Sequence, residues 1–353
     1  MLKATVSAFV ALLIGAVGGV LFYVVHAPLP WTLGAITASA IAAITINRWR
    51  IPFEVRAWAR PVVGVLAGSS FTPDVAGSML NWWPALLAVA FYSLVVSVVG
   101  YITFRRVLGF DAPTAYFAAT PGWLSELSLL GGTLGADSKT LVLIHAVRVV
   151  MVVFTISLLM QLFVSGPIGG PPPHAAHQYH DLGDWLILVA SGALGFFVAH
   201  YTRMPGGTLV VPMIFSAIVH AAGLTSAAPP YWLVAFVQVL IGCIAGSRFA
   251  GITLAELRRS LPIAVVWAAF MVTSAIAMAL LGSMILGMPF TWLLLALAPG
   301  GASEMLIITY ALRADVAFVA ICQMARVYLV LAFAPLFFQY VSTSSSDGPR
   351  DDR

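Results

Sequence analysis

The sequence contains very little charge. Only 8% of its 353 residues are Asp, Glu, Lys or Arg, whereas 61% are hydrophobic. Soluble domains carry about 25% charged residues, so this chain cannot cover the surface of a water-soluble globule of its length. The composition therefore excludes a soluble enzyme and a disordered chain. It predicts an all-α polytopic membrane protein, because apolar runs such as residues 85–101 lack the alternation of a transmembrane β-barrel.

Cysteines and recognisable catalytic motifs are also scarce. The two cysteines, Cys243 and Cys322, lie in apolar runs without metal-ligand spacing, which excludes a disulfide-stapled domain. The net charge of +4 is spread over loops, so we expect no direct nucleic-acid partner. No phosphate-binding, dinucleotide-binding, zinc-protease or Ser/His/Asp motif can be identified. We therefore expect neither an enzyme nor a bound cofactor.

The chain contains an internal duplication, and its strongest block includes polar residues. With an offset of 178, Pro121-Gly122, Ser125-Glu126, Leu134, Ala136-Asp137 and Arg148 match Pro299-Gly300, Ser303-Glu304, Leu312, Ala314-Asp315 and Arg326. Membrane composition explains chance matches of Ala and Leu, but not of Glu, Asp and Arg. The duplication divides the chain into two halves.

The two halves are residues 1–165 and 184–341. A linker rich in Gly, Pro and His joins them at residues 166–183, and a polar tail that we expect to be disordered follows at residues 342–353. The linker carries His174, His177 and His180 at a spacing that could chelate a metal. It offers no scaffold or cysteine, so we expect a solvated linker and no metal site.

The basic residues predict how the halves are oriented. They follow the second and fourth spans of the first half, but the first and third spans of the second half. These residues are Arg48, Arg50, Arg56, Arg60, Arg105 and Arg106, then Arg203, Arg248, Arg258 and Arg259. Equivalent loops therefore have opposite charge bias, which indicates two inverted-topology repeats and cytoplasmic termini.

Inversion requires an odd number of crossings in each half. We count five full spans and one interrupted segment per half, at residues 110–136 and 288–313. We predict that the interrupted segments are re-entrant, which gives about ten transmembrane helices plus two broken helical segments. In the competing count these segments cross the membrane completely, and the chain has twelve spans and parallel repeats. The arginines would then lie on the side that the positive-inside rule does not favour.

The Pro-Gly pairs should break the interrupted segments. Proline removes a backbone donor and glycine frees the backbone, so helices should stop at Pro121-Gly122 and at Pro299-Gly300. Such backbone is tolerated at membrane depth only where protein buries it or water reaches it. An ordinary kink is the simpler alternative. Because two equivalent breaks occur, we favour a binding or translocation site.

Each break is followed by a serine and a glutamate. If a helix restarts there, Glu126 and Glu304 lie in its first turn and complement its dipole. Alternatively, each carboxylate binds a proton or cation near the midplane. Ser125 and Ser303 could supply hydroxyl ligands to the same site.

Arg148 and Arg326 are predicted to lie deep within spans. An isolated charge is costly at that depth, so we expect each to pair with the glutamate of its own half. Such a pair could fix helix register, or the arginine could capture an anionic substrate. Asp137 and Asp315 precede these spans and should be N-caps.

Two further runs place small residues on one helix face. The pattern Gly-x-x-Ala-Gly-Ser-x-Phe occurs at residues 64–71 and again at residues 242–249. We expect it to allow close helix packing.

The duplicated pattern resembles the AbrB family of bacterial membrane proteins, which is defined by such a duplication. The resemblance covers nearly the whole chain. It rests on Leu33-Gly34-Ala35 after Pro30-Trp31, Val211-Pro212-Met213, the paired Gly-x-x-Ala-Gly-Ser runs, and Pro-Gly-x-x-Ser-Glu with its downstream Arg in both halves. Members are labelled transcriptional regulators or ammonia monooxygenases, so the resemblance implies a link to the regulation of gene expression.

The residues favour a different activity. We find no DNA-binding motif and no convincing copper-ligand set. The leading hypothesis is a secondary transporter of the bacterial inner membrane, proton- or cation-coupled, for a small molecule or ion of unknown identity. The alternatives are a membrane sensor that acts indirectly on gene expression and, more remotely, a membrane monooxygenase. The sequence leaves the oligomeric state open, a homo-oligomer included.

Overall fold

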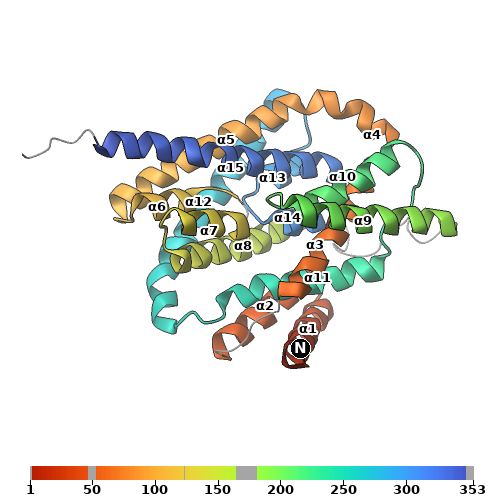
Figure 1. Cartoon of the computed structure of the whole chain (residues 1–353), viewed down its shortest axis with the longest axis horizontal. Coiled ribbons are helices and arrows are strands. Elements are labelled where there is room, and N and C mark those ends of the chain that lie inside the picture. The colour runs from red at the N-terminus through yellow and green to blue at the C-terminus, as the bar shows by residue number, and fades with distance from the viewer. Residues whose placement is uncertain (1, 47–52, 123, 164–180, 347–353) are drawn as a thin grey trace, which may run out of the picture.

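The computed structural model describes residues 2–46, 53–122, 124–163 and 181–346, and these contain helices but no strands (Figure 1). The first half contains α1 (Leu2–Val24), α2 (Pro30–Thr45), α3 (Phe53–Gly68), α4 (Pro73–Ser78), the 3₁₀ turn η1 (Met79–Trp82), α5 (Trp83–Ile102), the π-helical turn η2 (Thr103–Val107), α6 (Ala112–Ala119), α7 (Leu124–Thr133) and α8 (Ser138–Gln161).

The second half repeats this order. It contains α9 (Leu182–Thr202), α10 (Gly207–Ala221), α11 (Tyr231–Gly246), the 3₁₀ turn η3 (Ser247–Phe249), α12 (Leu254–Leu286), α13 (Phe290–Leu297), α14 (Ala302–Ala311) and α15 (Val316–Ser346). Helix α15 continues to Ser346, so residues 342–346 are helical where the sequence predicts the start of a disordered tail.

Several of these helices suit a bilayer. Among the described residues, six helical segments are long and apolar enough to cross a membrane, and shorter apolar helices of 10–17 residues accompany them. Many large apolar side chains of α1, α5 and α9 are exposed, including Leu21, Phe91 and Phe197. Such an apolar exterior is expected when lipid replaces water. The prediction of an all-α polytopic membrane protein is therefore confirmed.

The two halves pack against each other through their small-residue runs. Helix α2 packs against α11, and the equivalent α10 packs against α3. A Cβ on Gly246 would lie 2.6 Å from the Ile36 carbonyl oxygen, and a Cβ on Gly64 would collide with the Leu209 carbonyl oxygen. Any side chain at these positions would force the backbones apart. The prediction that these runs allow close packing is confirmed.

The equivalent helices α5 and α12 run antiparallel to one another. Tyr92 Oη donates to the Met271 carbonyl oxygen at 2.8 Å, and the Phe104 ring packs on Trp267 with centroids 5.3 Å apart. The C-terminal end of α5 therefore lies beside the N-terminal part of α12. The N-termini of α8 and α12 meet there as well, where Lys139 and Glu256 form an exposed ion pair at 3.9 Å.

Both interrupted segments are helical hairpins. In the first, the Asp137 amide at the start of α8 donates to Thr114 Oγ1 in α6 at 2.8 Å, while Arg148 in the middle of α8 reaches Gly122 at the break. Helix α6 therefore lies alongside the first half of α8, and α7 runs back to the N-terminal end of α8. Figure 1 shows α6, α7 and α8 gathered at one end of the molecule.

The second hairpin follows α15 in the same way. The Trp292 ring lies 6.0 Å from that of Phe318 near the start of α15, and Arg326 reaches Ala298 at the break. Arg148 and Arg326 are each the eleventh residue of their helices, about 15 Å along at 1.5 Å per residue. The hairpin tips therefore contact α8 and α15 about 15 Å from the starts of these helices.

Candidate functional site

The helix breaks occur where the Pro-Gly pairs predict them. Helix α6 ends at Ala119 and α7 begins at Leu124, while α13 ends at Leu297 and α14 begins at Ala302. A broken helix leaves its last carbonyl groups without amide partners. In a membrane interior these groups need donors from elsewhere in the protein.

The two buried arginines supply those donors. Arg148 donates to the carbonyl oxygens of Thr120 at 3.0 Å and Gly122 at 2.8 Å. Arg326 donates to those of Leu297 at 3.1 Å and Ala298 at 2.9 Å. Both side chains are fully buried. The prediction that these arginines pair with the glutamate of their own half is wrong for Arg326, because its donors go to carbonyl groups and Glu304 pairs elsewhere.

A second pair of equivalent residues, three positions before each arginine, supports the hairpins. His145 Nε2 donates to the Phe117 carbonyl oxygen at 2.9 Å, and Gln323 Nε2 donates to that of Leu295 at 2.9 Å. Gln323 Oε1 also accepts a hydrogen bond from Arg326. Sequence reasoning missed both residues because they differ in type. Their shared spacing from the arginines was the available signal.

Asp137 and Asp315 are N-caps, as predicted. Asp137 accepts from the Lys139 amide at 3.0 Å, and Asp315 accepts from the Phe318 amide at 2.9 Å. Each cap lies between the second helix of its hairpin, α7 or α14, and the long helix that follows, α8 or α15. They position the site without belonging to it.

The two hairpin tips meet beside a small cavity of about 30 Å³. This volume has room for a water or a small ion. The residues that line it come from both halves: Arg60 of α3, Gly122 of the first break, Val149 of α8, Gly206 and Leu209 at the start of α10, Arg248 of η3, and Gly301, Ala302, Ser303 and Glu304 of the second break and α14.

Glu304 is the central charged group of this cavity. It lies in the first turn of α14, as predicted, and only 2% of the residue is exposed. Its Oε2 accepts from Ser303 Oγ at 3.0 Å, and its Oε1 lies 3.8 Å from Arg248 Nη2. The carboxylate folds back over Gly301, where any Cβ would collide with it. A side chain at position 301 would therefore force the Glu304 carboxylate to move.

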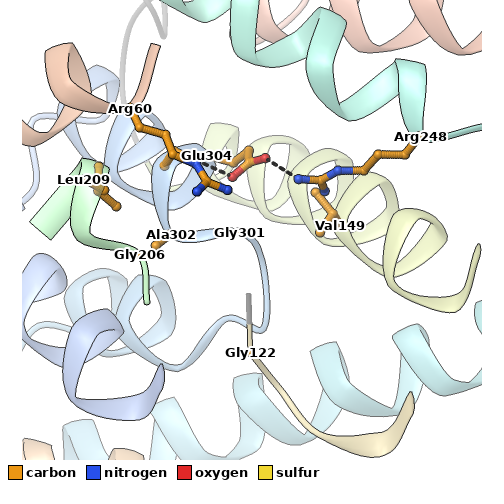
Figure 2. A pocket seen from close by; sticks show the side chains of 10 residues that line it. Arg60, Gly122, Val149, Gly206, Leu209, Arg248, Gly301, Ala302 and Glu304 are labelled. Atoms are coloured by element: carbon orange, nitrogen blue, oxygen red, sulfur yellow. Dashed lines mark hydrogen bonds and ion pairs between the residues drawn. The ribbon is translucent and has the colours of Figure 1, made fainter. Parts of the chain in front are cut away.

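Two arginines approach Glu304 from opposite sides. Figure 2 shows Arg60 pointing toward the carboxylate from α3 and Arg248 pointing toward it from η3. Both arginines were expected in cytoplasmic loops, and neither was predicted to be a site residue. Arg248 gave one signal, since it lies within the small-residue run at residues 242–249, a helix-packing segment rather than a loop.

A larger cavity lies on the other side of Arg248. Its volume is about 710 Å³, and it opens among the starts of α6, α8 and α12. Its lining is mixed and includes the charged residues Asp111, Asp137, Lys139, Glu256 and Arg259. Arg248 lines both cavities, so the small cavity and this vestibule adjoin at this residue.

The predicted site residues fall into three groups. Gly122, Ser303 and Glu304 line the cavity, while Arg148 and Arg326 lie behind the tips and hold their carbonyl groups. Pro121, Pro299 and Gly300 form the breaks themselves. The backbones of Ser125 and Glu126 lie in the first turn of α7, but their side chains lie outside the part that the structure describes.

Metal ligands do not cluster in the described residues: no group of three or more His, Cys, Asp or Glu side chains is placed to hold an ion. The histidines His174, His177 and His180 lie outside the described residues. Cys243 and Cys322 are both buried free thiols.

The fold and the site together define a polytopic helical membrane protein of two equivalent halves, with paired broken-helix hairpins that meet at a buried charged cavity. The chain belongs to the AbrB family. The family model described as "Transition state regulatory protein AbrB" matches residues 31–342.

Two relatives match over nearly the whole chain. One is a protein of Escherichia coli (strain K12) named "Putative regulator AbrB", 23% identical over 334 residues, which cover 91% of this chain and 92% of the relative. The other, from Bacillus subtilis (strain 168), is named "Uncharacterized protein YhjN" and is 24% identical over 350 residues, which cover 92% and 91%.

Proposed function

We propose that this protein is a proton- or cation-coupled secondary transporter of the bacterial inner membrane, built from two inverted repeats. The observation that carries the proposal is the meeting of two hairpin tips at a buried cavity between the halves. Discontinuous helices at the midplane and at a repeat interface are the usual substrate and ion sites of secondary transporters. The protein acts on no covalent bond in this proposal and needs no cofactor.

The helix directions support the inversion. Each hairpin returns to the same end of the neighbouring long helix from which it started, so it does not cross the membrane. Five helical elements per half are left to cross: α1, α2, α3, α5 and α8, then α9, α10, α11, α12 and α15. An odd number reverses the second half. The antiparallel packing of α5 and α12 agrees with this count, as does the meeting of the α8 and α12 N-termini.

The topology can be tested by cysteine labelling from each side of the membrane. We expect Arg106→Cys and Arg258→Cys to react from the cytoplasmic side and Leu224→Cys from the opposite side, because the residues around the first two positions share the vestibule. Both native thiols are buried, so the unmodified chain is a low-background control. Labelling of positions 106 and 258 from opposite sides contradicts the inversion.

Transport itself can be tested in proteoliposomes. Metabolites that differ between cells with and without the protein supply the candidate substrates, and uptake is measured with and without a pH gradient. We expect a gradient to raise wild-type uptake and the Glu126→Gln/Glu304→Gln variant to lose that increase, because a carboxylate in the membrane can carry a proton. Arg258→Gln, at an exposed position, is the matched control.

A membrane sensor is the second candidate function, because the Escherichia coli relative is named a regulator. A sensor would bind its ligand in the same cavity without moving it. Specific binding by folded protein without any flux would favour the sensor over the transporter.

A further inference from the structure

We propose that the cavity at the hairpin tips binds a carboxylate group of a small organic anion between Arg60 and Arg248, and that Glu304 occupies this position when the anion is absent. This inference rests on the proposed site at the hairpin tips and names its substrate class. The sequence alone left the charge of the substrate open, because it showed two buried acids and two buried arginines. The structure adds Arg60 and Arg248 to that balance.

The charges around the tips favour an anion. Two arginines, Arg60 and Arg248, line the cavity against one glutamate, Glu304, so the charged side chains of the lining carry one net positive charge. Arg148 and Arg326 lie behind the tips and hold their carbonyl groups. Excess buried charge is costly unless a counter-ion compensates it.

The buried arginines cannot compensate one another, and backbone dipoles only partly stabilise them. Arg148 and Arg326 donate to carbonyl groups, and within the described part of the chain their Nε atoms have no acceptor. An added cation would increase the repulsion. An added carboxylate would reduce it, and the planar guanidinium groups suit its geometry.

Glu304 shows which group fits the cavity. Its carboxylate lies with one oxygen 3.8 Å from Arg248 and is approached by Arg60 from the other side (Figure 2). The cavity is also lined by Gly301, Ala302 and Ser303, the N-cap and first turn of α14, where free amide groups favour an anion. An incoming carboxylate would therefore find the same partners that Glu304 now uses.

The vestibule supplies a route for the anion. Arg248 is 13% exposed and lines both the vestibule and the inner cavity. An anion in the vestibule would meet Arg248 first and could then replace Glu304 as its partner. The small inner cavity means that Glu304 must move aside for a ligand larger than a water molecule to enter.

The test is equilibrium binding to the purified full chain in nanodiscs, using a four-carbon series that differs in charge. The probes are succinate, neutral succinamide and cationic putrescine, with acetate and citrate to vary the size of the anion. We expect at least one carboxylate to raise the midpoint of thermal unfolding, and neither succinamide nor putrescine to do so.

Variants then assign the partners. We expect Arg248→Gln and Arg60→Gln each to weaken carboxylate binding at least tenfold, because each removes charge-assisted hydrogen bonds. Arg248→Lys, which keeps the charge, should restore part of the affinity even if the glutamine variant folds poorly. Arg258→Gln, on the exposed side of α12, should bind as the wild type does.

Glu304→Gln separates an anion site from a cation site. If Glu304 is the competing carboxylate, its loss leaves carboxylate affinity unchanged or higher. Binding of putrescine that is lost in Glu304→Gln overturns the proposal, and so does the absence of binding by every carboxylate. Since binding is measured without flux, carboxylate binding without uptake refutes only the transporter, whereas uptake of a cation or neutral solute refutes only the anion site.

Discussion

Arg326→Leu should lower the free energy of unfolding by about 3 kcal/mol or more, and Arg148→Leu should do the same. Each arginine is the donor for at least two carbonyl groups at a helix break. Leucine fills a similar apolar volume but donates nothing. A buried acceptor left without a donor costs about 1–3 kcal/mol, and no water replaces the donor at this depth.

The measurement is reversible unfolding in detergent micelles, or thermal unfolding where reversibility fails. Arg326→Lys should fall between the leucine variant and the wild type, since lysine keeps a donor but loses the two-armed geometry. Arg258→Leu controls for the general loss of an arginine, because this residue is exposed. A leucine variant within about 0.5 kcal/mol of the wild type, the range of ordinary surface substitutions, would contradict the role of the arginines in holding the tips.

Glu304→Gln should abolish uphill accumulation of a carboxylate while leaving its exchange intact. If the proposed proton coupling acts through Glu304, the anion displaces this residue from Arg248 and its carboxylate carries the coupled proton. Return of the empty site requires the ionised carboxylate to pair with Arg248 again. Glutamine resembles the protonated glutamate but cannot release a proton. The site with bound anion can therefore still change its orientation, whereas return of the empty site is no longer linked to the proton gradient.

The experiment compares net uptake driven by a pH gradient with counterflow of labelled carboxylate in the same proteoliposomes. We expect net uptake to fall more than tenfold and counterflow to stay within about twofold of the wild type, each tenfold change corresponding to about 1.4 kcal/mol. Arg258→Gln changes an exposed residue outside the site, so it should retain net uptake. Equal loss of both fluxes in Glu304→Gln would assign this residue to the fold rather than to coupling.

Composition and local patterns were sufficient to predict the membrane class, the duplication and the location of the helix breaks. These features are local or compositional. The apolar content determines whether a chain can insert into a lipid bilayer. A Pro-Gly pair interrupts a helix wherever it occurs. The roles of Asp137 and Asp315 as caps were also predictable, because a cap acts on the amide groups next to it.

The partners of the charged residues could not be predicted without the packed fold. Arg60 and Glu304 are 244 positions apart in the numbering, and no local pattern predicts that they meet. The sequence suggested that Arg326 would pair with Glu304, because opposite charges attract. The fold instead gives Arg326 to the carbonyl groups that the break exposes, since these groups have no other donor, and gives Glu304 to Arg248. Which charges remain to receive a ligand therefore follows from the packing of the two halves.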